Sequence, residues 1–127
     1  MTTDEVQSII SYSYPLIQKY YGKGKLPIPK INTSHKNTYA MHSGEPEAEG
    51  EHDATSIAEY YEGTIYLYLP NITNEEELLR SIVHEYIHYT QDSELLAKYK
   101  KIYSYDEDPN EIEAHKNEED WEMFSQK

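Results

Sequence analysis

Apolar residues recur at helix-like spacing near the start of the chain and again past its middle. Residues 2–21 carry such a stripe behind Thr3, a predicted N-cap, and Pro15 within the stripe predicts a kink or two shorter helices. The most regular pattern covers residues 73–92, which open with N-capping side chains and three glutamates and continue as an apolar stripe. We therefore predict a well-capped amphipathic helix over this second stretch.

Two further helices are predicted in the C-terminal third of the chain. Residues 93–102 form a short one. The last helix begins at Asp108, because the sequence Asp-Pro-Asn-Glu supplies an N-cap, a proline at the first helical position and a glutamate at the third. It runs toward Phe124, and its predicted anchors in the core are Ile112, Trp121 and Phe124.

Between these helices the sequence has features of strands. Residues 26–34 contain two prolines, which a sheet tolerates at its edge, so this segment predicts an edge strand. Residues 56–61 and 64–69 flank Glu62-Gly63 and predict two antiparallel strands joined by a two-residue turn. The whole pattern predicts an α+β fold with an N-terminal helix, a small and mostly antiparallel sheet, and C-terminal helices.

Length and charge narrow the class of protein. The chain has 127 residues, which predicts one domain over residues 1–127, and 24 acidic against 11 basic side chains give a net charge of −13. So acidic a chain lacks the clustered Lys and Arg of nucleic-acid binding or of a basic membrane anchor. Signal-peptide features, membrane-length apolar runs and cysteines are all absent from the sequence. We expect a cytoplasmic protein, most simply a monomer.

The composition also bears on folding. Ile, Leu, Val and Phe are scarce for so charged a chain, which warns of disorder, but 14 tyrosines can build a core whose hydroxyls reach water or backbone. Residues 43–54, with five acids, two glycines and a proline, predict a disordered, solvated loop, with partner binding or covering of a cleft as the alternative. His35, His42 and His52 have no matching partner and predict surface positions.

The candidate chemistry lies in the predicted helix at 73–92, which contains an HExxH motif at residues 84–88. Residues four apart share one face of a helix, so the imidazoles of His84 and His88 can bind a single metal ion. Glu85 is offset by about 100°, which places its carboxylate beside the ion, where it can move a proton from water to a leaving amine. Two imidazoles favour zinc over magnesium. The alternative is an amphipathic helix with two exposed histidines.

A catalytic zinc site needs a third protein ligand, and the chain has no cysteine. Candidates lie in the last predicted helix, in the sequence Glu-Ile-Glu-Ala-His of residues 111–115. Glu111 and Glu113 are rivals, because a shift of two residues rotates a helix position by about 200° and only one can face the ion. His115 is a further candidate, and capping of the helix is the ordinary alternative for Glu111.

The two motifs resemble those of the gluzincin metallopeptidases and, given the short length, the small gluzincin-like metallopeptidase domains of phages and mobile elements. In that family the HExxH helix is followed by a helix whose glutamate is the third ligand. Aligned on Ala114, the resemblance implies Glu111 as that ligand and places His115 where the family has an Asp or Asn that orients a histidine ligand. His115 would accept a hydrogen bond from His84, donate to the transition state, or lie at the surface.

The resemblance also implies how a substrate binds. In the family a peptide adds antiparallel to the edge strand above the metal, which here implies the strand at 64–69, with Tyr66 and Tyr68 as substrate-binding residues. A further donor is expected to stabilise the tetrahedral oxyanion. Tyr103 and Tyr105, just before the ligand helix, are the candidates, and Tyr105 is preferred; with 14 tyrosines in the chain, an ordinary core or surface position is the alternative for both.

Together these features predict a zinc-dependent metallopeptidase. His84, His88 and Glu111 would hold Zn²⁺, and Glu85 would act as general base and then as general acid. The acidic surface should favour basic or unfolded peptide or protein substrates through attraction that weakens with salt. Two alternatives are an acidic interaction protein, such as a mimic of a nucleic-acid surface, and a catalytically inactive relative that retains zinc.

Overall fold

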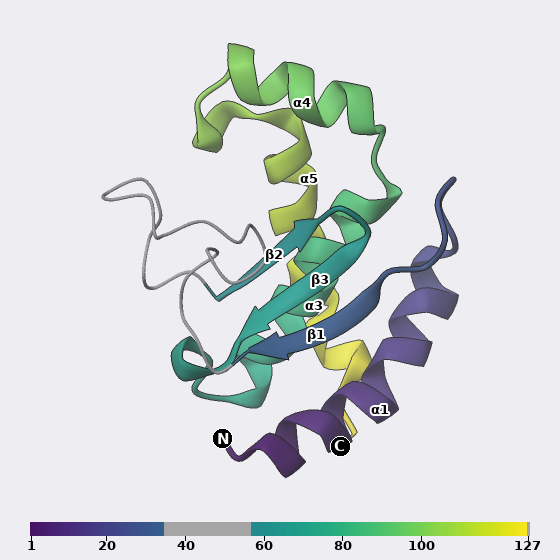
Figure 1. Ribbon diagram of the computed structural model, residues 1–127, viewed down its shortest axis with the longest axis vertical. Helices are drawn as coiled ribbons and strands as arrows, with labels where there is room; N and C mark the ends of the chain where they lie inside the picture. The colour runs from purple at the N-terminus through teal and green to yellow at the C-terminus, as the bar shows by residue number, and fades with distance from the viewer. Residues whose placement is uncertain (35–56, 127) are drawn as a thin grey trace.

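The computed structural model describes residues 1–34 and 57–126 and has the predicted α+β fold (Figure 1). The helices are α1 (Thr3–Tyr21), α3 (Glu75–Thr90), α4 (Ser93–Ile102) and α5 (Pro109–Asn117), with short 3-10 helices η1 (Leu69–Asn71), η2 (Tyr105–Glu107) and η3 (Glu118–Phe124). The strands are β1 (Lys30–Ser34), β2 (Ala58–Tyr61) and β3 (Thr64–Tyr68). The predicted acidic loop at 43–54 and the histidines at 35, 42 and 52 lie outside the described residues.

The three strands form one mixed sheet in the order β1-β3-β2. β2 and β3 are antiparallel and joined by Glu62 and Gly63, whose φ angles of 48° and 83° suit the predicted two-residue turn. β1 pairs parallel with β3, so the expected antiparallel arrangement holds for one of the two strand pairs. The prediction that 64–69 forms an edge strand is wrong, because β3 is central and β1 and β2 are the edges. Alternation identifies a strand, but it does not fix which neighbours the strand pairs with.

The helix starts follow local capping residues. Thr2 caps α1 in a reciprocal pair of hydrogen bonds with Glu5, one residue before the expected cap. α1 also runs as one helix through Pro15, so the alternative of two shorter helices is wrong. Asn74 caps α3, as the sequence indicated. Among the described residues, no helix is long and apolar enough to cross a membrane.

The C-terminal segment departs from its prediction. α5 ends at Asn117, and the chain continues to Phe124 as η3. Phe124 is buried as expected, but Ile112 is 53 % exposed and does not anchor the helix. The buried face of α5 is instead formed by Asn110, Glu111 and Ala114. The face that α5 directs toward the interior is therefore largely polar. It carries Glu111, one of the candidate site residues.

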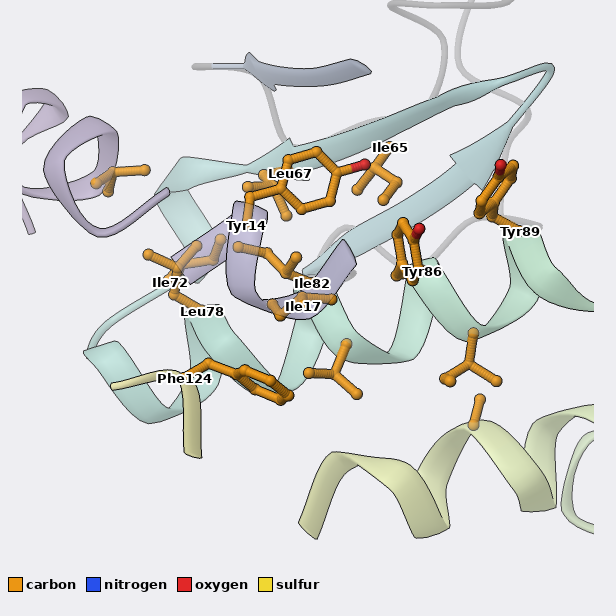
Figure 2. Packing of buried hydrophobic residues seen from close by; sticks show 14 residues of the cluster. Tyr14, Ile17, Ile65, Leu67, Ile72, Leu78, Ile82, Tyr86, Tyr89 and Phe124 are labelled. Carbon is orange, nitrogen blue, oxygen red and sulfur yellow. The ribbon is translucent and has the colours of Figure 1, made fainter. Parts of the chain in front are cut away.

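The hydrophobic core lies between the sheet, α1, α3 and the C-terminal segment (Figure 1, Figure 2). Ile65 and Leu67 project from β3 toward α3, where Ile82 and Tyr86 meet them, and all four are fully buried (Figure 2). Phe124 closes the core from the C-terminal side (Figure 2). Because α3 is covered on several faces, the HExxH helix is held firmly in place.

Tyrosines complete this core and bond to the backbone, as their number in the sequence suggested. The hydroxyl of Tyr14 donates to the carbonyl of Pro29, and that of Tyr86 donates to the carbonyl of Gly22. Each donor–acceptor distance is 2.6 Å. The two rings meet edge to face, with centroids 5.9 Å apart. These bonds attach the segment before β1 to α1 and α3, and so set the position of the sheet over α3.

Candidate metal centre

Three donor atoms meet between α3 and α5. The Nε2 atoms of His84 and His88 are each 3.0 Å from Oε1 of Glu111, and 3.2 Å from each other. All three side chains are buried. The structure thus brings together the three residues predicted as metal ligands. Donor atoms of His84, Glu111 and His115 also lie within 4.8 Å of one another, so this group could hold a metal ion.

The triangle of donor atoms matches the size of a tetrahedral zinc site. Zinc takes imidazole nitrogen and carboxylate oxygen at about 2.0–2.1 Å, which separates two ligands of a tetrahedron by about 3.3 Å. The observed separations of 3.0, 3.0 and 3.2 Å are slightly shorter. An ion therefore fits after a small outward movement of the three side chains.

The other ring nitrogens have acceptors that fix the protonation of each imidazole. Nδ1 of His84 lies 2.6 Å from Oε2 of Glu118, and Nδ1 of His88 lies 2.7 Å from Oε1 of Gln91. The Gln91 amide cannot be turned around, because its Nε2 donates to Glu113 and to a backbone carbonyl. Both Nδ1 atoms are therefore donors, which leaves a lone pair on each Nε2 when the rings are neutral.

The consequence is a cluster of acceptors without a donor. Two imidazole lone pairs and a carboxylate oxygen of Glu111 converge on one point, and such a set needs either a cation or additional protons between its members. In the metal-free state protons take that place. Burial lowers the pKa of His84, but hydrogen bonds to Glu111 and Glu118 outweigh burial and raise this pKa to about 10. Burial raises the pKa of Glu111, yet hydrogen bonds from His84 and His88 hold it well below the ordinary range.

Glu118 is the residue that sequence reasoning missed. The resemblance offered a hydrogen bond to His84 as one of three roles for His115, whereas the structure gives this hydrogen bond to Glu118. Oε2 of Glu118 also lies 3.0 Å from Nδ1 of His115, so one carboxylate oxygen serves both rings. Glu118 follows Glu111 by seven residues, which is two helical turns and hence the same face. That spacing was the available signal, but three successive acids at 118–120 look like an ordinary solvated run.

Glu85, the glutamate of the HExxH motif, lines the same cleft as the predicted ligands His84, His88 and Glu111. Glu85 is buried, and burial is the main cause of its raised pKa, while His84 and His88 and the backbone amide of Tyr60 in β2 act in the opposite direction. Its carboxylate therefore binds a proton more readily than an exposed glutamate does. This property suits a group that must accept a proton and release it again.

Two hollows along β2 form the cleft, and both are lined by Ala58, His84, Glu85 and Tyr105. The hollow at the start of β2 has a volume of about 390 Å³, and the one toward Tyr61 has about 310 Å³. The candidate site therefore lies where an elongated groove passes the edge of the sheet, a shape that suits an extended chain.

Tyr105 stands at this groove with its side chain 57 % exposed as part of η2. Its hydroxyl is 2.8 Å from Nε2 of His115, whose other nitrogen bonds Glu118. Burial and the nearby carboxylates of Glu111 and Glu85 raise the pKa of Tyr105, so the hydroxyl keeps its proton. The predicted oxyanion donor and the ligands thus come together at one place.

Tyr66 and Tyr68, by contrast, do not lie on an edge strand. Both belong to β3, the central strand, and Tyr68 is 1 % exposed with its hydroxyl donating to Glu59. The reason for assigning them to substrate binding was the edge position, but the edges are β1 and β2, and β2 is the edge strand that lines the cleft at the candidate site. Any strand-addition role therefore passes from β3 to β2.

Comparisons with known proteins add no identification: no family model, no curated protein and no solved structure matches the chain. The resemblance to the gluzincins accordingly rests on the two sequence motifs alone.

Proposed function

We propose that the protein is a zinc-dependent metallopeptidase in which His84, His88 and Glu111 are the metal ligands. The observation that carries the proposal is the convergence of three acceptor atoms at 3.0–3.2 Å, with each imidazole fixed from behind by Glu118 or Gln91. Burying a cluster of acceptors held in this way costs free energy unless a cation binds between them. Two nitrogens and one oxygen favour zinc among the common metals.

Three ligands from the protein leave a fourth position, as in catalytic rather than structural zinc sites. A bound Zn²⁺ supplies Lewis acidity, which polarises a peptide carbonyl and makes water more acidic. Glu85 then accepts the proton of the attacking water and passes it to the leaving amine, a task that its buried position and raised pKa favour. Tyr105 donates its hydroxyl to the oxyanion that develops on the carbonyl.

The edge of β2 is the part of the sheet that supports a bound peptide. Tyr61 faces Thr64 beside the two-residue turn, so the alternation of the ladder directs the N–H and C=O groups of Ala58 and Tyr60 to the outer edge. The N–H of Tyr60 bonds the Glu85 carboxylate there, so a peptide would pair with the groups of Ala58 and the C=O of Tyr60. Among the described strands, none pairs with that edge. A peptide that adds antiparallel there passes directly beside Glu85, because Tyr60 lies next to its carboxylate.

Glu85→Gln tests this proposal directly. The variant keeps the size and hydrogen-bonding shape of the side chain but cannot accept the proton, so cleavage of an unfolded protein substrate should fall by at least about 100-fold. Its zinc content should equal that of the wild type, because Glu85 is not a ligand. Equal cleavage by the two proteins would show that Glu85 is not the base, and cleavage unaffected by chelators would refute the zinc mechanism.

A closed zinc site is the second candidate, favoured by one observation. The ring of His115 packs against that of His84 with centroids 4.6 Å apart, and its donor atoms lie near those of Glu111. Rotation of His115 away from Tyr105 would add a fourth protein ligand and make the site structural. Cobalt substitution separates the two candidates, since replacing His115 with alanine would change the ligand-field spectrum only if His115 binds the metal.

A further inference from the structure

The groove along β2 has two ends with different charge. At the start of β2 its walls are Glu77, Arg80 and Ser81 of α3 and Glu118 of η3. At the other end they include Glu59 of β2 and Lys100 and Leu96 of α4. A peptide lying along β2 therefore meets a different electrostatic surface on each side of the bond that is cleaved.

The first pocket is acidic although it contains the only arginine of the chain. Nε of Arg80 is 2.8 Å from Oε2 of Glu76, and its other guanidinium nitrogens lie 4.0 Å from Glu118 and 3.7 Å from Glu119. Three carboxylates thus surround one guanidinium, and of these Glu118 lines the pocket, together with Glu77. The pocket keeps a negative excess, because its lining carries the carboxylates of Glu77 and Glu118 against the single charge of Arg80, while Glu85 lies at the candidate metal centre.

The direction of β2 determines which part of a peptide enters that pocket. β2 runs from Ala58 at the acidic pocket to Tyr61 near Lys100. Antiparallel addition is the more stable pairing, and it places the C-terminal part of the peptide beside Ala58. The residue that follows the cleaved bond therefore faces Glu77 and Glu118.

From this arrangement we propose that the peptidase cleaves on the N-terminal side of lysine or arginine, and that the acidic pocket of Glu77, Ser81 and Glu118 holds the basic side chain. This inference rests on the proposed peptidase activity and names its substrate class. A peptide bound in the reverse direction would place the same basic side chain in the other hollow, where Lys100 offsets the charge of Glu59. Charge therefore selects both the residue and the direction of the chain.

The test uses a peptide series that differs only in the residue after the cleaved bond, which is lysine, glutamate or norleucine. With zinc-loaded wild type, kcat/KM should be highest for lysine and about fivefold or more above glutamate, as expected for partly exposed charge pairs. Glu77→Gln keeps an oxygen for its hydrogen bonds with Thr73 and should reduce this ratio at least about twofold. Glu122→Gln, an equal change of charge on an exposed residue of η3, is the matched control and should leave the ratio unchanged.

Binding of the same peptides to Glu85→Gln, followed by calorimetry, separates the pocket from the catalytic claim. Tighter binding of the lysine peptide without cleavage by wild type would support the pocket and refute the peptidase. Cleavage with equal kcat/KM for all three peptides would overturn the inference and leave the peptidase standing. A preference for glutamate that disappears in Arg80→Gln would also overturn it, because Arg80 would then be a receptor for carboxylates.

Discussion

The two imidazoles of the candidate centre are held in different ways. His84 donates to Glu118, a carboxylate that lies 34 residues further along the chain at the start of η3. His88 donates to Gln91, a neutral amide three residues away that caps the same helix. A charged acceptor makes the stronger hydrogen bond and increases the basicity of the ring. The comparison teaches that the orientation of the His84 ring depends on the tertiary fold, whereas the orientation of the His88 ring depends mainly on its own helix.

Of the two acceptors behind the imidazoles, the charged one should have the larger effect on zinc affinity when it is removed. Glu118→Gln keeps an oxygen at the site but loses the charge, so zinc affinity should fall by about 10- to 100-fold. Competition with a zinc chelator measures this directly. Unchanged affinity would mean that the carboxylate behind His84 is not important.

A second change would show that the loss comes from the missing carboxylate. His115→Asp in the Glu118→Gln background places an acid at the position where, by the resemblance, the gluzincins have Asp or Asn. Since His115 lies beside the ring of His84, this double variant should recover part of the affinity. If it binds zinc no better than the single variant, then position 115 cannot replace Glu118.

Removing the neutral acceptor should have a smaller effect. Gln91→Ala takes away the bond to His88 and the bonds that Gln91 donates to the backbone of Asn110 and to Glu113. Because the lost acceptor is uncharged and local, zinc affinity should fall by about tenfold or less, at the lower end of the range for such partners. The same chelator competition applies, and a loss larger than that of Glu118→Gln would reverse the comparison.

The smallest difference concerns the stability of the metal-free protein. Hydrogen bonds to Glu111 and Glu118 raise the pKa of His84 to about 10 against the lowering effect of burial, from an ordinary value of 6.5. A raised pKa means that the proton stabilises the folded state below pH 6.5, and that this stabilisation is lost as pH rises toward 10.

Thermal melts with a chelator present should show this loss. Between pH 6.5 and 9.5 the wild type should lose more in Tm than Glu118→Gln, by a few degrees, since 1 kcal/mol shifts Tm by about 4 °C in a domain of this size. Parallel curves for the two proteins would contradict the assigned hydrogen bond.

Local signals explain how much of the site could be predicted. HExxH on a helix, the cap at Asn74 and the start of α5 at Asp108 are all fixed by neighbouring residues, and they place His84, His88 and Glu111. Glu118 could not be identified in this way, because its role depends on how η3 packs against α3. A run of exposed acids gives no indication of which one is turned inward.

In the fold, too, the features set by neighbouring residues were predictable and those set by distant contacts were not. The hairpin of β2 and β3 was predictable because Glu62-Gly63 lies between two strand-like segments. The parallel pairing of β1 with β3 was not, since it joins segments about 34 residues apart and no local pattern encodes it. That pairing makes β3 central, which removed Tyr66 and Tyr68 from the sheet edge and left β2 beside the candidate site.

The central claim, that His84, His88 and Glu111 bind zinc, is tested most directly by the zinc content of three purified proteins. Elemental analysis should find about one zinc per chain in wild type and in Glu113→Gln, because Glu113 contacts Gln91 and not the ligand atoms. Glu111→Gln should lose most of its zinc, since it removes one of three ligands. No zinc in reconstituted wild type, or loss confined to Glu113→Gln, would contradict the account.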